Sequence, residues 1–231
     1  SANAELKTLG VDSATSAPEL LWGIAILYQQ MGAAHFSQQI AGNLQRQWLT
    51  RWPSGPWLKA WELAYPRPYE KAVSQSAKRY GLSPALLYAV MREESAFDPR
   101  AVSKANAYGL MQLLASTARG YSKKVGLPAQ AQSLLIPRIN IAYGSYVLSQ
   151  FAAKFPSNSL LAIPGYNAGP ASAKRWLKEL PSTDFDLWVE LIPYRETRDY
   201  TKRVLASRAA YAYLYEQGGE EALKLPIQVE N

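Results

Sequence analysis

Apolar residues recur along most of this chain with the 3.6-residue period of an α-helix, and the alternating pattern of a half-buried β-strand is nearly absent. Proline and glycine divide these periodic stretches into short segments. Segments of this kind are typical of helices that pack on one another through one apolar face. The sequence therefore predicts a mainly α-helical protein.

A proline-rich joint, YPRPY, divides the predicted helices into two groups. Prolines two residues apart interrupt any helix and stiffen the backbone. Before the joint, helices are predicted over residues 18–32, 35–52 and 56–65. The first has an apolar stripe at Leu20, Leu21, Ile24, Leu27, Tyr28 and Met31. We therefore expect a small α-helical array over residues 1–65 and a second domain over residues 66–231.

Helices are also predicted after the joint, and several have a start or stop signal. Gly81 is a helix terminator, and Ser83 followed by Pro84 is a start signal, because a side-chain oxygen caps the helix and proline fits its first turn. The helix from Pro84 is expected to run to about Asp98, since Pro99 disfavours helical geometry in the preceding residue. Further helices are predicted over residues 68–81, 140–155, 157–180 with a turn at 167–170, and 196–217.

The chain has no cysteine and one histidine, His35, among its 231 residues, which limits the chemistry available. The absence of cysteine excludes disulfides, thiolate metal sites and a cysteine nucleophile. No acid or second histidine stands at ligand spacing from His35, so we expect a structural histidine and neither a metal nor another cofactor. Hydrolytic chemistry must then depend on carboxylates.

A net charge of +7 favours an anionic partner. The basic residues are scattered and form no dense run, so nucleic acid is not the expected partner. No stretch reaches the roughly 20 apolar residues that cross a bilayer, and the opening SANAELKTLG is not a signal peptide. We expect a mature or excised form of the protein, which leaves room for membrane association through a segment preceding Ser1.

Two adjacent acids, Glu93 and Glu94, stand at the end of the predicted apolar helix. Glu94 lies three and four residues after Met91 and Val90, so it continues the apolar stripe. Glu93 lies at the same spacing from Val90 and the smaller Ala89. A carboxyl group at the mouth of an apolar wall has a raised pKa and can give its proton to a leaving oxygen near neutral pH. The spacing favours Glu94 for that role, and an ordinary surface pair at a helix end is the alternative.

Four stretches resemble, in order and spacing, the soluble lytic transglycosylase family. They are ALLYAVMREESAFDPRAVSKANAYGLMQL, NIAYGSYVLSQF, GYNAGPASAKRWL and LIPYRETRDYTKRVL, and the resemblance covers about Tyr65 to Tyr215. It implies a lysozyme-like, goose-type catalytic domain over residues 66–231. Residues 1–65 resemble the end of the helical superstructure that precedes this domain in larger family members.

The resemblance also implies site residues. Glu94, directly before Ser95, corresponds to the family's sole catalytic acid and base, and Glu93 corresponds to a variable neighbour that is often Gln. Pro164 stands where the family has small residues, and we expect it to kink or end its helix. The implied substrate-binding residues are Ser103, Gly109, Met111, Gln112, Tyr166, Asn167, Glu196 and Tyr200.

The implied reaction breaks the β-1,4 bond between N-acetylmuramic acid (MurNAc) and N-acetylglucosamine (GlcNAc) in peptidoglycan. It uses no water and closes a 1,6-anhydro ring, with Glu94 acting first as acid and then as base. The expected partners are the glycan strand, in the periplasm of the bacterial cell envelope, and proteins of cell-wall synthesis or remodelling. Two alternatives stay open: a goose-type lysozyme that hydrolyses the same bond, and a non-catalytic helical module that binds peptidoglycan.

Overall fold

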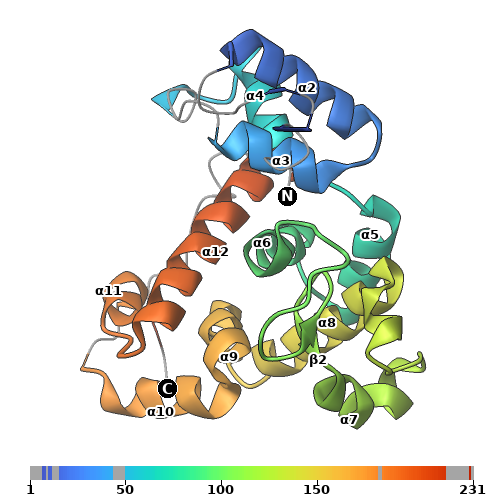
Figure 1. The fold of residues 1–231 in the computed structure, drawn as a ribbon. Coiled ribbons are helices and arrows are strands. Elements are labelled where there is room, and N and C mark those ends of the chain that lie inside the picture. The colour runs from blue at the N-terminus through green and yellow to red at the C-terminus, as the bar shows by residue number, and fades with distance from the viewer. Residues whose placement is uncertain are drawn as a thin grey trace. The chain divides into compact units, whose positions relative to one another are not determined.

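The computed structural model describes residues 7–8, 10–11, 16–43, 50–181, 184–216 and 229. The chain divides into two compact units (Figure 1). The first comprises Ser1–Pro68 with Ala96–Asp98, and the second comprises Tyr69–Ser95 with Pro99–Asn231. Each unit has its own buried apolar residues. Among the described residues, no helix has both the length and the apolar character needed to cross a membrane.

The first unit contains α2 (Pro18–Gln30), α3 (Ala34–Asn43) and α4 (Pro56–Ala64). Proline begins α2 and α4, where its missing N–H has no helical partner to lose. Leu21 of α2 packs with Ile40 of α3 in the core. The predicted apolar stripe of α2 is only partly buried. Of its residues, Leu20 is 49% exposed, Leu27 58% and Met31 78%.

The second predicted helix is shorter in the structure. α3 ends at Asn43, residues 44–49 lie outside the described residues, and Arg51 and Trp52 are not helical. His35 of α3 has its Nδ1 2.9 Å from the backbone oxygen of Ala96. This contact gives the histidine a structural role within the first unit.

The second unit is built mainly from helices, with α6 packed along α12 and α8 in contact with α5 and α9 (Figure 1). The sequence did not predict α11, η2 or the short β1–β2 hairpin, because each is brief. It also did not predict α7, whose 11 residues contain Gly120 and few large apolar side chains. The elements are α5 (Glu70–Tyr80), α6 (Pro84–Ser95), β1 (Ala107–Tyr108), β2 (Leu113–Leu114), α7 (Ala115–Val125), η2 (Gln132–Leu135), α8 (Pro137–Ala152), η3 (Ser159–Leu161), α9 (Ala162–Ala168), α10 (Pro170–Glu179), α11 (Phe185–Glu190) and α12 (Arg195–Tyr215).

Helix α6 ends earlier than predicted, at Ser95 instead of Asp98. Ala96 and Phe97 adopt left-handed backbone angles, with φ of 48° and 66°, so the helix stops before Pro99 can act on it. The Ser95 hydroxyl donates a hydrogen bond to the backbone oxygen of Leu110 at 2.9 Å. This bond ties the end of α6 to the β1–β2 turn.

Helix α9 does not end at Pro164, which was one of the two predicted outcomes, but continues to Ala168. Because α9 begins at Ala162, Pro164 lies in the first turn, where the backbone N–H groups have no partner inside the helix. The break between α9 and α10 falls at Gly169, whose φ is 86°, and Pro170 begins the next helix. The turn that was expected over residues 167–170 is therefore confined to Gly169.

Candidate active site

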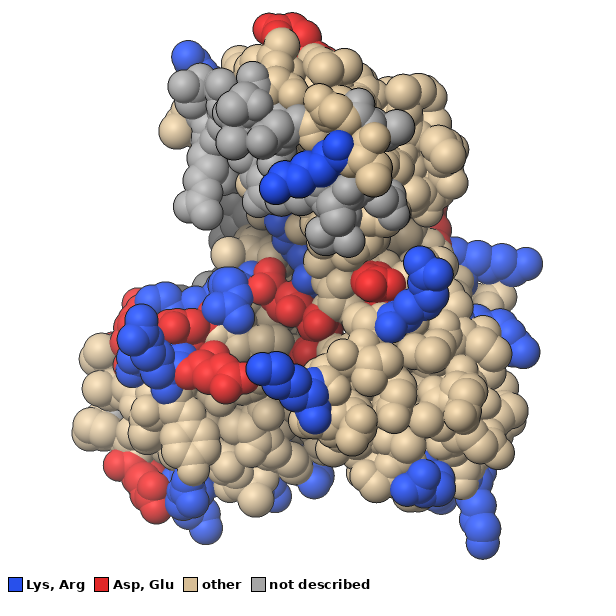
Figure 2. Space-filling view, viewed as in Figure 1, with Lys and Arg blue, Asp and Glu red and all other residues tan. Residues whose placement is uncertain are grey.

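A pocket of about 490 Å³ opens on the second unit. Its walls come from the end of α6, the segment around the β1–β2 hairpin, α8, the junction of α9 with α10, and the start of α12. Figure 2 shows acidic side chains gathered in the middle of this face, with Lys and Arg around them. The predicted site residues that line the pocket are Glu94, Ser103, Gln112, Tyr166, Asn167 and Glu196.

Glu94 is partly buried at the end of α6 and lines this pocket. Its Oε1 accepts a hydrogen bond from the Tyr200 hydroxyl at 2.7 Å. Burial raises the pKa of Glu94 to about 7; the Tyr200 hydrogen bond lowers it, and the carboxylates of Glu93 and Glu196 raise it. A carboxyl group with this pKa is present in both protonation states near neutral pH, so it can give a proton and take one back.

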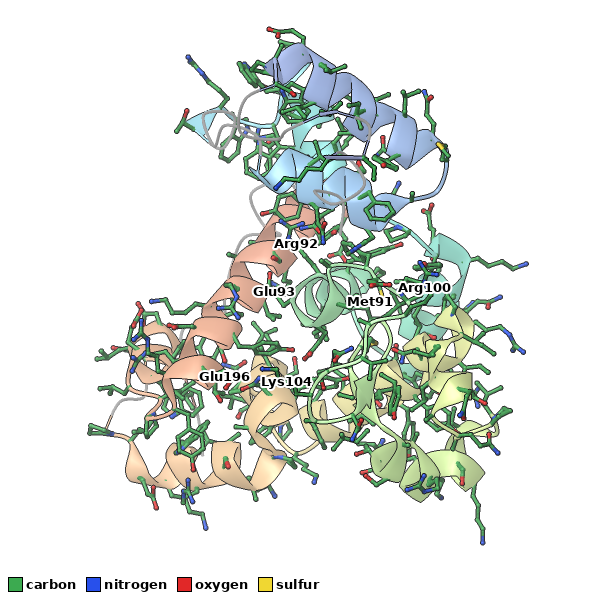
Figure 3. All side chains as sticks on the ribbon, viewed as in Figure 1. Met91, Arg92, Glu93, Arg100, Lys104 and Glu196 are labelled. Atoms are coloured by element: carbon green, nitrogen blue, oxygen red, sulfur yellow. The ribbon has the colours of Figure 1, made fainter. Side chains whose placement is uncertain are left out.

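Glu93 faces α12 and does not line the pocket (Figure 3). It accepts hydrogen bonds from Arg203 Nε at 2.8 Å and from Ser207 Oγ at 3.2 Å. Its side chain is only 14% exposed. Glu93 is therefore a link between α6 and α12 rather than a free surface acid, and its neighbour Glu94 is the one that reaches the pocket.

Two tyrosines surround the Glu94 carboxyl group in different ways. Tyr200 is only 4% exposed and does not line the pocket, so its ring offers no face to a sugar and its hydroxyl instead holds Glu94. Tyr166 does line the pocket, and its hydroxyl donates to the backbone oxygen of Met111 at 2.8 Å. Burial and the nearby Glu94 carboxylate raise the pKa of both tyrosines well above the usual value, so both hydroxyls stay protonated donors.

Gly109 and Met111, two of the implied substrate-binding residues, are buried and do not line the pocket. The Met111 side chain packs on α8 at Gly144, where an added Cβ would lie 2.8 Å from the Met111 Cβ. Gly109 has a φ of 71° and makes the turn between the strands. Both residues help to fix the loop that carries Gln112.

Asn140, a fully buried residue of α8, holds that loop in place. Its Nδ2 donates to the backbone oxygens of Tyr108 and Leu134, each at 2.7 Å, and its Oδ1 accepts from the Met111 N–H at 2.7 Å. Sequence reasoning missed this residue. The available signal was an amide side chain at the start of an otherwise apolar helical stretch, where a buried polar group requires partners.

Ser103 and Gln112 are held on the pocket wall by the backbone around them. The Ser103 hydroxyl accepts from the Ala107 N–H at 3.1 Å. Gln112 has a φ of 46°, and its Nε2 donates to the backbone oxygens of Ala101 at 3.3 Å and Gly109 at 2.9 Å. These contacts fix both polar side chains before any ligand arrives, which is a property of binding sites that lose little entropy on binding.

Glu196 and Asn167 form the opposite wall. Glu196 is exposed near the start of α12 (Figure 3). Arg198, in the same motif, donates to the Ile192 backbone oxygen at 3.2 Å and forms no ion pair with Glu196. Thr197 donates to the Asn167 Oδ1 at 2.6 Å and thereby orients that amide. Thr197 was not predicted as a site residue, although it lies beside Glu196 in the same motif.

The described residues contain no group of three or more His, Cys, Asp or Glu side chains arranged to hold a metal ion. The lining of the pocket provides one carboxyl group with a pKa near neutrality, a second carboxylate and several hydroxyl and amide groups. Such a set suits proton transfer to and from a neutral polyhydroxyl ligand.

The Glu94→Gln variant should be more stable than the parent at alkaline pH. The carboxyl group has a pKa of about 7 in the folded chain and 4.5 as the ordinary value. At pH values between 4.5 and about 7, the folded chain keeps a proton that the unfolded chain has released. The free energy of unfolding of the parent therefore falls as pH rises through this range. We expect the variant to gain about 2–3 kcal/mol at about pH 8 and nothing at about pH 4. Urea unfolding of both proteins at the two pH values measures this, and an equal difference at both would contradict it.

The sequence matches the family model described as the transglycosylase SLT domain over residues 71–189. The soluble lytic murein transglycosylase of Salmonella typhimurium is 34% identical over 165 residues, which are 70% of this chain and 25% of the relative. The chain thus spans about a quarter of that relative's length.

Two solved structures share the fold. The inactive mutant of the lytic transglycosylase Slt from Pseudomonas aeruginosa superimposes with a TM-score of 0.75 at 31% identity, covering 94% of this chain and 33% of that one. The 70 kDa soluble lytic transglycosylase of Escherichia coli superimposes with a TM-score of 0.78 at 27% identity, and the match covers 91% of this chain and 32% of that one. The predicted mainly helical, lysozyme-like fold is confirmed. The family-model match over residues 71–189 and the similarity to these structures show that the chain belongs to the lytic transglycosylase family defined by the SLT domain.

Proposed function

We propose that this protein cleaves the β-1,4 bond between MurNAc and GlcNAc in peptidoglycan without water and leaves a 1,6-anhydro-MurNAc end. The observation that carries the proposal is the Glu94 carboxyl group. It lies in the wall of an open pocket and has a pKa of about 7. Membership of the SLT family supports the same reaction, since relatives bear the name lytic murein transglycosylase. One group with this pKa suits both halves of a reaction that needs an acid and then a base.

In the first step Glu94 gives its proton to the oxygen that joins the two sugars. The bond from that oxygen to C1 of MurNAc breaks, its electron pair leaves with GlcNAc, and the acetamido oxygen of MurNAc bonds to C1 as an oxazolinium. In the second step the Glu94 carboxylate removes the proton of the C6 hydroxyl, and O6 attacks C1 as the oxazolinium opens. The proton returns to Glu94, so the cycle closes without consuming water.

The surroundings of Glu94 suit this sequence of steps. Because the Tyr200 hydroxyl bonds to Oε1, it fixes the carboxyl plane and leaves the other oxygen for the substrate. The hydroxyl and amide groups of Ser103, Gln112 and Asn167 match the hydroxyl and acetamido groups of the two sugars. Glu196 adds a negative charge that favours the positive charge developing at C1.

Two rival functions use the same pocket. A hydrolase would have a second carboxylate activate a water, and Glu196 is the carboxylate available on this wall. A binding module would hold the strand and leave the bond intact. The raised pKa of Glu94 argues against the binding module, because strongly raised carboxyl pKa values in open pockets are typical of groups that transfer protons, and binding alone needs no proton transfer.

Digestion of purified glycan strands in water enriched in the heavy oxygen isotope separates the three functions. We expect products lighter by one water molecule than hydrolytic fragments and free of the isotope. Products that carry the heavy isotope would assign a lysozyme-type hydrolase. Strands that are retained by the protein but remain uncut would assign a binding module. Mass spectrometry of the released fragments reads all three outcomes in one experiment.

We further propose that the protein acts in the periplasm, because that compartment holds the peptidoglycan on which the reaction depends. Membrane association and contacts with cell-wall synthesis or remodelling proteins remain expectations from the sequence. The positive net charge of +7 supports work on a carboxylate-bearing polymer.

A further inference from the structure

Helix α12 presents three donor side chains to the end of α6, at positions 200, 203 and 207. These positions are three and four residues apart, so they lie along one face of the helix. The Tyr200 hydroxyl donates to Glu94 at 2.7 Å. The next two donors, Arg203 and Ser207, both bond to Glu93. One stripe of α12 therefore holds both neighbouring acids of α6, although only Glu94 lines the active-site pocket.

The end of α12 also holds the other end of α6. The Glu216 carboxylate, directly after α12, accepts hydrogen bonds from the Ser83 hydroxyl at 2.7 Å and from the Ala85 N–H at 3.1 Å. A carboxylate at this place satisfies N–H groups that have no partner inside the first turn, and it suits the positive end of the helix dipole. Because α6 is attached to α12 at both ends, these contacts fix how the two helices are aligned along each other.

The bond between Arg203 and Glu93 joins two charged groups. Arg203 Nε lies 2.8 Å from Oε2 of Glu93, whose side chain is only 14% exposed, while the Arg203 side chain is 56% exposed. A poorly solvated carboxylate needs a cation or hydrogen-bond donors, and Ser207 supplies a neutral hydroxyl at 3.2 Å. Arg203 therefore supplies the positive charge that the Glu93 carboxylate contacts.

The charge of Glu93 matters for the reaction because Glu94 is its neighbour. Burial is the main cause of the raised pKa of Glu94; the Tyr200 hydrogen bond lowers it, and the nearby carboxylates raise it further. The titratable groups that interact with the Glu94 carboxyl group are Glu93 on α6, Tyr200 and Glu196 on α12, and Tyr166 on α9. How strongly Glu93 disfavours the ionised form of Glu94 thus depends on its own partner, Arg203.

We propose that Arg203 is a positioning residue for the reaction: it holds Glu93 on α12 and so keeps Glu94 at its place beside Tyr200, with a neutralised neighbour. The inference rests on the proposed function, in which Glu94 gives a proton and takes one back. Arg203 does not line the pocket, so it acts through Glu93 and not on the substrate. Without Arg203, the end of α6 is held less firmly, and the acid form of Glu94 persists to higher pH.

The test replaces Arg203 by methionine, which keeps an unbranched side chain but has neither charge nor donor. In Arg203→Met we expect kcat at the pH optimum to fall about three- to tenfold with KM nearly unchanged, because the carboxyl group is held less precisely while the substrate contacts remain. The alkaline limb of kcat/KM reports the loss of the Glu94 proton in the free enzyme. It should move up by about 0.3–0.5 pH unit at low salt and by less at high salt. Arg203→Lys restores the charge and should return the limb to the parent position.

Two controls show whether the effect belongs to this pair. Lys202→Met removes the same charge from the neighbouring residue of α12, whose ammonium group bonds to Glu190 at 2.6 Å. It should leave kcat and the alkaline limb at nearly the parent values. In a Glu93→Gln background, Arg203→Met should move the limb by less than about 0.1 pH unit, because the charge through which Arg203 acts is gone.

An unmoved limb in Arg203→Met, even with a lower melting temperature, would make Arg203 an ordinary link between two helices and overturn the inference. A shift as large in Lys202→Met, in Arg203→Lys or in the Glu93→Gln background would overturn it as well. Titration of the Glu94 carboxyl carbon by NMR, assigned by comparison with Glu94→Gln, measures the same shift without substrate. A shift in this titration with a parent that makes no anhydro product refutes the proposed function alone, whereas anhydro product without any shift refutes only the inference.

Discussion

The Glu94→Gln variant should release anhydro products at least about a thousandfold more slowly than the parent while binding glycan strands with similar affinity. The amide has nearly the shape of the carboxyl group, so the Tyr200 hydroxyl can still donate to its oxygen. It neither gives a proton to the leaving oxygen nor takes one from the C6 hydroxyl. Because the proposed mechanism uses the same group in both steps, no other residue replaces it. Initial rates on purified strands, together with strand binding by equilibrium titration, measure the two effects separately.

Glu93→Gln is the matched control, since it makes the same chemical change one residue away. Arg203 and Ser207 face Glu93, and an amide oxygen can still accept from either, so we expect activity within a few-fold of the parent. Removing the Glu93 charge also removes one cause of the raised Glu94 pKa. The acid form of Glu94 is then lost at lower pH, so the alkaline limb of the rate profile should move to lower pH. A loss in Glu93→Gln as deep as in Glu94→Gln, or an active Glu94→Gln enzyme, would show that the catalytic residue is misassigned.

Helix geometry favoured one of the two acids as the inward-facing residue before any partner was known. Neighbouring residues point about 100° apart, and the apolar stripe through Val90 and Met91 favoured Glu94 as the one facing inward. Periodicity did not show what Glu93 would meet, because Arg203 and Ser207 lie on α12, far away in sequence. Local spacing predicts which way a side chain points from its own helix, and only the packed structure reveals its partner.

The motif residues near the hairpin show what a resemblance alone does not predict. A resemblance places Gly109, Met111 and Gln112 in one motif without saying which of them reach the ligand. The structure buries the first two against α8 and leaves Gln112 on the pocket wall. The reason is Asn140, which bonds to the loop from outside the motif. The end of α6 was missed for a similar reason, since left-handed Ala96 carries none of the glycine or asparagine signal that usually marks such a residue.

Gly109→Ala should lower the free energy of unfolding by about 3–5 kcal/mol, the largest stability loss that we expect from adding one methyl group. Gly109 has a φ of 71°, which strains any residue with a side chain. Its added Cβ would also lie 2.5 Å from Asn140 Nδ2 and even closer to the backbone oxygen of Leu134. Neither neighbour can yield without breaking the hydrogen bonds by which Asn140 holds the hairpin turn. Urea unfolding measures the loss, and cleavage should also fall because Gln112 is displaced.

Two other glycines separate the two causes of this loss. Gly126 has a φ of 77° but no heavy atom within 4 Å of its added Cβ, so Gly126→Ala should cost only the left-handed strain, about 1–2 kcal/mol. Gly120 lies inside α7 with equally open surroundings and no left-handed φ, so Gly120→Ala should stabilise the protein by about 0.5–1 kcal/mol. If Gly109→Ala lost no more stability than Gly126→Ala, the close approach of the hairpin turn to Leu134 and Asn140 would not constrain that position. A larger loss at Gly109 than at Gly126 assigns the difference to that approach, and thus to the contact that presents Gln112 to the pocket.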